Sequence, residues 1–368
     1  MSSARRIEIY DTTLRDGTQG EGFNLSLQDK LSIAQKLDEL GVDYIEGGFP
    51  LSNPKDAQFF KDVREMSFRS AKVAAFGMTR RRGIKAEDDP GMKALLDAQT
   101  PVVTIVGKTS PYQVEKVLNV TLEENLTMIA DSIGLMKSAG RQPVYDAEHF
   151  FDAWRANSAY ALRTLEAALG AGASVLVLCD TNGGSMPEFI AEAVTGVRQK
   201  LAGARIGIHP HNDGGVAVAN ALAAINAGAD HAQGTINGVG ERCGNLDLIP
   251  LVANLQVKYG HDCLRPGTLK LLTDVSRYVY ETANLNPVQG QPYVGLSAFA
   301  HKGGMHVHAV QKDVSTYEHV SPETVGNSRK ILVSELSGVS NIAGKAGKKF
   351  DIEHDKVVLK RVLDRVCE

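Results

Sequence analysis

LGAGASVLVLCDTNGG, residues 169–184, joins the end of a helical pattern to a short apolar run and a polar turn. A glycine just past a helix fits a left-handed C-cap. The run Val175–Leu178 is typical of a strand that is buried on both faces, as in a parallel sheet covered by helices. The stretch therefore predicts a helix followed by a central strand of an α/β fold.

The same pattern recurs at residues 37–50 (LDELGVDYIEGGFP) and 225–242 (INAGADHAQGTINGVGER), and amphipathic segments such as Leu27–Leu40 and Ser158–Leu169 lie between the strands. Eight βα units in about 270 residues are typical of a TIM (β/α)8 barrel. A doubly wound sheet is the alternative, but it would more often show GxGxxG at its first turn, and the sequence has none. We expect strands at 6–11, 43–48, 72–77, 102–106, 143–148, 174–179, 205–209 and 231–235.

Composition excludes several classes of function. The net charge of -3 and an aromatic content of 6% argue against a nucleic-acid partner. The chain contains no run of 18 apolar residues and no signal-peptide pattern at its N-terminus, so we expect no membrane span. Its four cysteines form no CxxC pair, which favours reduced thiols and a cytoplasmic protein.

The alternation of strand and helix patterns ends near residue 285, where NLNPVQGQPYVG (284–295) is rich in turn-forming residues. We therefore expect a catalytic barrel at 1–285 and a linker with a small, mostly helical lid subdomain at 286–368. Within the second part we expect a short helix near 328–337 and a final amphipathic helix at 355–368. The chain stops inside that last pattern, which suggests a frayed end or a further domain beyond it.

Polar groups follow the expected strands, and function in a TIM barrel sits at the carboxyl ends of the strands. Many charges at one rim are costly to desolvate unless a counter-charge such as a cation is present. The groups are Arg15 and Asp16 after strand one, Glu46 in strand two, Asp146 and Glu148 in strand five, Asp180 to Asn182 after strand six, and His209 to Asp213 after strand seven.

HPHND (209–213) gives the strongest local signal. In an extended segment residues i and i+2 point the same way, so His209 and His211 can face one ion. A carboxylate from Asp16 would complete a two-histidine, one-carboxylate triad with open positions. Nitrogen and oxygen donors without thiolate favour Mg²⁺ or Mn²⁺, with Zn²⁺ as an alternative. Two hydrogen-bonded histidines in a turn are the simpler alternative, and alternation assigns Cys179 to the core.

Arg15 cannot be a ligand because its guanidinium is always cationic. It could bind a substrate carboxylate or stabilise a developing oxyanion, or it could form a salt bridge to Glu46 or Glu148. Thr181 could donate to a substrate carboxylate or cap the following helix. In NGVGERCGNLDL (237–248), Glu241 and Asn245 lie on a glycine-rich loop that could hold an anion or only form a turn.

A histidine-rich stretch, AFAHKGGMHVHAVQKDVSTYEHV (298–320), follows the expected barrel. One imidazole with a pKa near neutrality would make a general base or acid there. Surface histidines without partners are the alternative.

With these residues assembled, the chain resembles the DRE-TIM metallolyase family. It is most similar to the Claisen-condensing branch of citramalate, 2-isopropylmalate and homocitrate synthases, and within it to the longer citramalate synthases. The matching motifs run in order along the chain: DTTLRDGTQ (11–19), GGFPLSNPKD (47–56), HPHND (209–213), NGVGERCGN (237–245), HKGGMHVHAV (301–310) and STYEHVSPETVGN (315–327).

The resemblance implies a reaction in which a 2-keto acid, most simply pyruvate, chelates the metal while a base removes a methyl proton from acetyl-CoA. The enolate attacks the keto carbon, and thioester hydrolysis then releases CoA. The resemblance also implies a homodimer in which the lid reaches the neighbouring active site. It assigns Asp16, His209 and His211 to the metal, Arg15, Glu46, Thr181 and Asn245 to substrate, and catalytic roles to Arg15, Glu148, His306 and Tyr317; no separate cofactor site is implied.

Three features depart from the family pattern. Many relatives carry Asp two residues after the lid histidine, where this chain has His308, so Glu318 is a candidate replacement. Asp146 stands where some pyruvate-specific relatives carry an aromatic residue. Relatives of this kind also carry a C-terminal regulatory domain, which we expect to be absent from this chain.

Two other functions remain as alternatives. A lyase or aldolase of the same superfamily, such as hydroxymethylglutaryl-CoA lyase, would show a catalytic Cys in its glycine-rich loop. Cys243 lies in such a loop, but ERCGN (241–245) follows the synthase pattern. A non-catalytic binding barrel would be favoured by loss of a metal ligand, and the sequence retains Asp16, His209 and His211.

Overall fold

The structure is a computed structural model that describes residues 4–334, 337–352 and 354–367. The chain divides into two compact units. The first comprises Met1–Thr268 with Tyr278–Leu285, and the second comprises Leu269–Arg277 with Asn286–Glu368.

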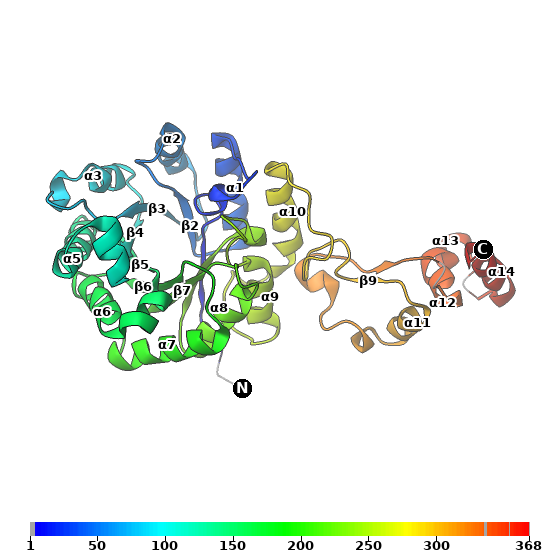
Figure 1. Ribbon diagram of the computed structural model, residues 1–368. Helices are drawn as coiled ribbons and strands as arrows, with labels where there is room; N and C mark the ends of the chain where they lie inside the picture. Colours follow the sequence, from blue (N-terminus) through cyan, green and yellow to red (C-terminus); the bar gives the residue numbers. More distant parts are fainter. Residues whose placement is uncertain (1–3, 335–336, 353, 368) are drawn as a thin grey trace. The chain divides into compact units, whose positions relative to one another are not determined.

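The first unit is a closed barrel of eight parallel strands in chain order, with the first strand pairing with the eighth (Figure 1). Helices lie outside the barrel and between the strands, so the predicted TIM barrel is confirmed. The strands are β1 (Glu8–Asp11), β2 (Tyr44–Gly48), β3 (Lys72–Met78), β4 (Val102–Lys108), β5 (Gln142–Glu148), β6 (Val175–Asp180), β7 (Ile206–Pro210) and β8 (His231–Gly234).

Helix α1 (Leu27–Leu40) shows how local sequence sets the barrel's outer layer. Ser26 and Asp29 form a capping box at its N-terminus. Gly41 ends it in the left-handed region at a φ of 92°, where a side chain would be strained. The other main helices of the barrel are α2 (Pro54–Asp62), α3 (Pro90–Asp97), α5 (Leu122–Ser138), α6 (Phe150–Gly170), α7 (Pro187–Lys200), α8 (Ala217–Asn226) and α9 (Leu248–Val257), followed by α10 (Leu272–Thr282).

The barrel interior is filled by inward-facing residues of alternate strand positions, including Tyr10, Tyr44 and Val177. Cys179 belongs to this cluster, as predicted. Because Asp180 is its neighbour, the Asp180 side chain turns the other way, where it accepts hydrogen bonds from the backbone N–H and hydroxyl of Ser185. Asp180 is therefore a loop-fixing residue, and the expectation that it joins the polar rim was wrong.

The second unit is mostly helical, as predicted, with α11 (Gly304–Lys312), α12 (Val339–Ile342), α13 (Lys348–Phe350) and α14 (Lys356–Cys367). Ile342 of α12 packs with Leu359 and Leu363 of α14. The expected helix near 328–337 is wrong: Lys330–Ile331 form the short strand β10, which pairs in parallel with β9 (Ala300–His301), and residues 335–336 lie outside the described residues.

Among residues 4–334, 337–352 and 354–367, no helix combines the length and the apolar character that crossing a bilayer requires.

Candidate active site

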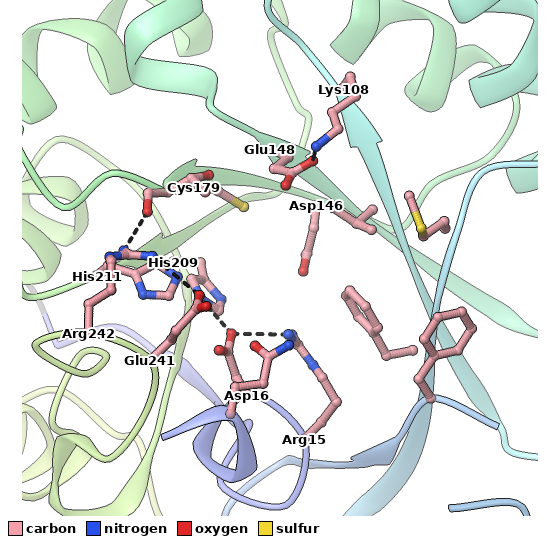
Figure 2. Close-up of a pocket in the computed structure, with 16 residues that line it drawn as sticks. Arg15, Asp16, Lys108, Asp146, Glu148, Cys179, His209, His211, Glu241 and Arg242 are labelled. Atoms are coloured by element: carbon pink, nitrogen blue, oxygen red, sulfur yellow. Dashed lines mark hydrogen bonds and ion pairs between the residues drawn. The ribbon is translucent and has the colours of Figure 1, made fainter. Parts of the chain in front are cut away.

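A cavity of about 360 Å³ opens at the carboxyl ends of the barrel strands (Figure 2). Its lining mixes charged groups with apolar side chains, which suits a small anionic ligand with an apolar portion. The lining residues used below are Arg15, Asp16, Phe76, Lys108, Asp146, Glu148, Cys179, Thr181, His209, His211, Glu241 and Arg242.

Asp16, His209 and His211 come together at one side of this cavity, and all three are buried. One potential ligand atom from each lies within 4.8 Å of the others. His209 is the second-last residue of β7 and points inward, and His211 follows two positions later on the same side, as the alternation predicted. The structure thus assembles the predicted triad, while the binding of an ion by it remains a prediction.

The donor set fits a divalent cation. Among the described residues, the buried Nδ1 atom of His211 has no hydrogen-bond partner, as expected of an atom that can bind a metal. Burial raises the pKa of the nearby Cys179 well above its usual range, so this side chain is a neutral thiol. Two imidazoles and one carboxylate without thiolate favour Mg²⁺, Mn²⁺ or Zn²⁺.

The charges of the triad depend strongly on one another. Burial alone would raise the pKa of Asp16, but the Arg15 guanidinium and His209 outweigh it and hold that pKa well below its usual range. Burial would also lower the pKa of His209, yet Asp16 raises it to about 8. Burial and the adjacent His209 lower the pKa of His211 to about 4. The group is thus arranged to hold positive charge next to the Asp16 carboxylate.

Arg15 is fixed by several contacts. Its Nε donates to Glu46, and its Nη1 lies 3.1 Å from Asp16 Oδ2. Its guanidinium also stacks on the Phe76 ring, 3.8 Å from the ring centroid. Glu46 is fully buried and accepts a 2.6 Å hydrogen bond from the Tyr10 hydroxyl. Of the alternatives for Arg15, the salt bridge to Glu46 is therefore present, and this position favours a role for Glu46 in orienting Arg15.

Glu148 lies across the cavity from Asp16 and Arg15, with Asp146 between (Figure 2), and Thr181 also lines this cavity. Lys108 Nζ lies 2.5 Å from Glu148 Oε2. Burial and the Glu46 charge raise the pKa of Asp146 to about 7, although His209 opposes the shift. Thr181 Oγ1 accepts from the backbone N–H of His149, which leaves its own hydroxyl hydrogen free to donate.

The loop after β8 reaches the same cavity through Glu241 and Arg242. Arg242 donates to both carboxylate oxygens of Asp213 and to the backbone carbonyl of Thr181, so it ties three loops together. Asn245 is buried and donates to the Val239 carbonyl, and it is not among the described residues that line the cavity. Its predicted contact with substrate therefore has no support from this geometry.

The predicted lid residues lie in the second unit. The rings of His306 and Tyr317 are 4.2 Å apart between centroids. Glu318, the candidate replacement for the missing Asp, instead pairs with Arg329 through both oxygens and with His301 at 3.0 Å. These contacts favour a structural role for Glu318. The action of His306 and Tyr317 at the barrel cavity stays a prediction.

Lys108 and Gln233 are two site residues that the sequence did not reveal. Lys108 pairs in register with Glu148 across β4 and β5. Gln233 lies in β8 and contacts both His209 and Asp146. Both face inward at strand positions that alternation could have identified, but their partners depend on strand register.

Two family models and several curated proteins are similar to this chain. The model of the HMGL-like family matches residues 6–279, and that of the homocitrate synthase post-HMGL domain-like family matches residues 293–368. The (R)-citramalate synthase of Aquifex aeolicus is 50% identical over 99% of this chain and 69% of its own length. The 2-isopropylmalate synthase of Halalkalibacterium halodurans is 35% identical over 91% of this chain and 64% of its own length.

Five curated (R)-citramalate synthases are 46–52% identical to this chain. The chain spans 65–69% of their lengths, about two thirds. Among solved structures, the HMG-CoA lyase of Bacillus subtilis has a TM-score of 0.67 at 19% identity, covering 79% of this chain and 98% of that one. At this identity the likeness concerns the fold alone.

Proposed function

This chain belongs to the HMGL-like family, and from that premise we propose that it condenses acetyl-CoA with pyruvate to give citramalate and free CoA. The observation that carries the proposal is the identity of 46–52% to five (R)-citramalate synthases over at least 95% of the chain. The 2-isopropylmalate synthases, at 34–36%, are less similar. The buried Asp16, His209 and His211 group supports metal-assisted chemistry.

Asp16, His209 and His211 would hold a Mg²⁺, Mn²⁺ or Zn²⁺ ion. Such an ion, when bound, neutralises the carboxylate of the keto acid and polarises its keto group. The chain's contribution is to present two nitrogens from the end of β7 and the residue after it, and one oxygen from the loop after β1.

Arg15 is placed to stabilise the negative charge that develops on the keto oxygen as carbon–carbon bond formation proceeds. Glu46 and Asp16 hold its guanidinium on one edge, and Phe76 packs against its face. A group fixed before the reaction needs no reorganisation when charge appears, and such preorganised donors supply a large part of catalysis.

Glu148 provides a polar group on the other wall of the cavity (Figure 2), and Thr181 provides a second polar group in the cavity lining. Glu148 forms an ion pair with the Lys108 ammonium, and its carboxylate oxygens can accept a further hydrogen bond. Thr181 can donate through its hydroxyl to a substrate carboxylate. We assign both residues to orienting the two substrates.

We assign His306 and Tyr317 to the proton transfers, in a homodimer whose lid reaches the neighbouring barrel. Residues 1–285 then act as the catalytic barrel, and residues 286–368 as linker and lid. The proposed substrates are central metabolites of the cytoplasm, which is where we place the protein.

The test is release of CoA thiol from acetyl-CoA by purified protein supplied with Mn²⁺ and one keto acid. We expect pyruvate to be the preferred acceptor over 2-ketoisovalerate and 2-oxoglutarate. Preference for 2-ketoisovalerate would instead favour the 2-isopropylmalate reaction, and absence of thiol release with all three would overturn the synthase proposal.

A further inference from the structure

Gln233 connects the predicted metal group to Asp146, a carboxyl group that lines the cavity. It lies in β8 and is fully buried. Its Oε1 is 2.8 Å from Nδ1 of His209, and its Nε2 donates to Asp146 Oδ1 at 3.0 Å. The other ring nitrogen of His209, Nε2, lies 3.3 Å from Asp16 Oδ2. One amide thus touches both a predicted ligand and a cavity-lining carboxyl group.

We propose that Gln233 is the positioning residue of the metal site: it holds the proton of His209 at Nδ1, so that Nε2 is the nitrogen presented to the cation beside Asp16. The inference rests on the metal-assisted function proposed above. It concerns how the ion is held, and not which keto acid reacts.

The chemistry of the amide supports this assignment. Its carbonyl oxygen can only accept, so the His209 nitrogen that faces it must carry a hydrogen. A metal-binding histidine commonly donates its other ring N–H to an acceptor that fixes both the ring orientation and the tautomer. Gln233 is placed to be that acceptor, and its complete burial leaves little room for another orientation.

Asp146 sets the direction of the amide. In its carboxylate form, which prevails at the pH of the test below, Asp146 only accepts, so it selects the NH₂ end of Gln233 and leaves the carbonyl oxygen facing His209. With the amide turned round, two acceptor oxygens would face each other at Asp146, and an NH₂ group would face His209 Nδ1. That arrangement would require the ring proton on Nε2, where it would compete with the cation.

The first experiment uses the unaltered protein loaded with Mg²⁺ and labelled with ¹⁵N at histidine. Long-range proton–nitrogen NMR spectra at about pH 9, where a free imidazole is neutral, report which ring nitrogen carries the hydrogen. We expect Nδ1–H for His209. A hydrogen on Nε2 in the loaded protein would overturn the inference.

The second experiment measures Mn²⁺ affinity by EPR titration of the free ion. Gln233→Leu removes the acceptor while keeping side-chain size, and it should weaken Mn²⁺ binding by about 10–100-fold, as loss of an outer-shell partner usually does. The paired change Gln233→Glu with Asp146→Asn exchanges the carboxylate and the amide, so it restores an acceptor to His209. This exchange should return affinity to within about threefold of the original protein.

Gln142→Leu is the matched control, because Gln142 begins β5 at the other end of the barrel and bonds to Tyr44. It should leave Mn²⁺ affinity within about threefold. If Gln233→Leu does not fold, the exchanged pair decides the question. Unchanged affinity in folded Gln233→Leu, an equal loss in the control, or no recovery in the exchanged pair would each contradict the inference.

These measurements involve neither acetyl-CoA nor a keto acid. A protein that passes them but releases no CoA would retain the Gln233 assignment and lose the synthase proposal. A protein that condenses its substrates but gives contradicting NMR or EPR results would retain the synthase proposal and lose the Gln233 assignment.

Discussion

The Nε2 atom of His209 lies 3.3 Å from the Oδ2 atom of Asp16, although the two side chains come from opposite ends of the barrel sequence. Both are buried, and Arg15 approaches the same Asp16 oxygen to 3.1 Å. Buried charges are stable only when they are paired or bind a metal. This relationship underlies the predictions about metal binding and catalysis.

Replacement of a predicted ligand should remove metal with little loss of stability. His209→Ala should weaken Mn²⁺ binding by at least about 100-fold. Replacing a residue that only contacts a metal ligand costs up to about this factor, and replacing a ligand itself should cost no less. The side chain lies at the cavity and not in the apolar core, so the melting temperature without metal should change little. His149→Ala, in the loop after β5, is the control and should bind Mn²⁺ normally. Unchanged metal content in His209→Ala would refute the triad.

Arg15→Lys should show whether catalysis needs only a positive charge at position 15 or also the planar shape of the guanidinium. Lysine keeps the positive charge but cannot reproduce the planar contacts with Glu46 and Phe76. Steady-state kinetics should show kcat lowered by about 10²–10³-fold, as for loss of an oxyanion donor. Mn²⁺ affinity should be nearly unchanged. A kcat equal to that of the original protein would show that Arg15 is only structural.

The proposed exchange of lids between subunits predicts complementation. His306→Ala should lower kcat by about 10²–10⁴-fold, the usual contribution of a general base, and Asp16→Ala should be inactive. If each lid serves the neighbouring barrel, mixed dimers of these two variants contain one intact site. Co-refolding equal amounts should then restore about a quarter of the original activity in a randomly assorted homodimer.

The control for this mixing experiment is each variant co-refolded with itself, which should give no more activity than that variant has before refolding. A monomer in sedimentation experiments, or a mixed dimer without activity, would exclude action of the lid in the partner.

Glu8 should contribute a pH-dependent part of the stability. Burial would raise its pKa, but His231 and Arg205 outweigh burial and lower it to about 2. A lowered folded-state pKa stabilises the fold at pH values above the unfolded pKa of about 4.5, and this contribution is lost as the pH falls towards 2. Glu8→Gln should therefore reduce the free energy of unfolding by up to about 3 kcal/mol at neutral pH.

Urea unfolding of both proteins from pH 7 to pH 3 checks this prediction, because the difference between them should narrow below about pH 4.5. Glu21→Gln changes an exposed carboxylate and serves as the control. A difference that stays constant over this range would show that the ion pair does not act through its charge.

The barrel could be predicted because its local signals agree with its global fold. Gly41 ends α1 in the left-handed region, and the apolar run at Val175 is the expected central strand. Alternation likewise placed His209 and His211 on one side. The same rule opposes Cys179 to Asp180 but does not say which of the two faces the cavity. Cys179 lines the cavity and Asp180 bonds to Ser185, so the assignment of Asp180 to the rim was wrong.

The other contacts of the site depend on how segments distant in the chain pair with one another, and a sequence does not display this pairing. Lys108 faces Glu148 only because β4 and β5 pair in that register. Gln233 looks like an ordinary strand residue until β7 brings His209 next to it. Glu318 was a reasonable candidate for the lid, but Arg329, eleven residues away, binds both its oxygens. The short strand β10 has too few residues for a periodic pattern.

Formation of citramalate can be followed directly by ¹³C NMR of [2-¹³C]pyruvate incubated with acetyl-CoA, Mn²⁺ and the purified protein. We expect loss of the keto carbon signal and growth of the tertiary alcohol carbon signal of citramalate, with one CoA thiol released for each pyruvate consumed. We expect neither change with Asp16→Ala. Consumption of pyruvate without that product, or unchanged pyruvate in a metal-loaded protein that condenses another keto acid, would contradict the proposed citramalate synthesis.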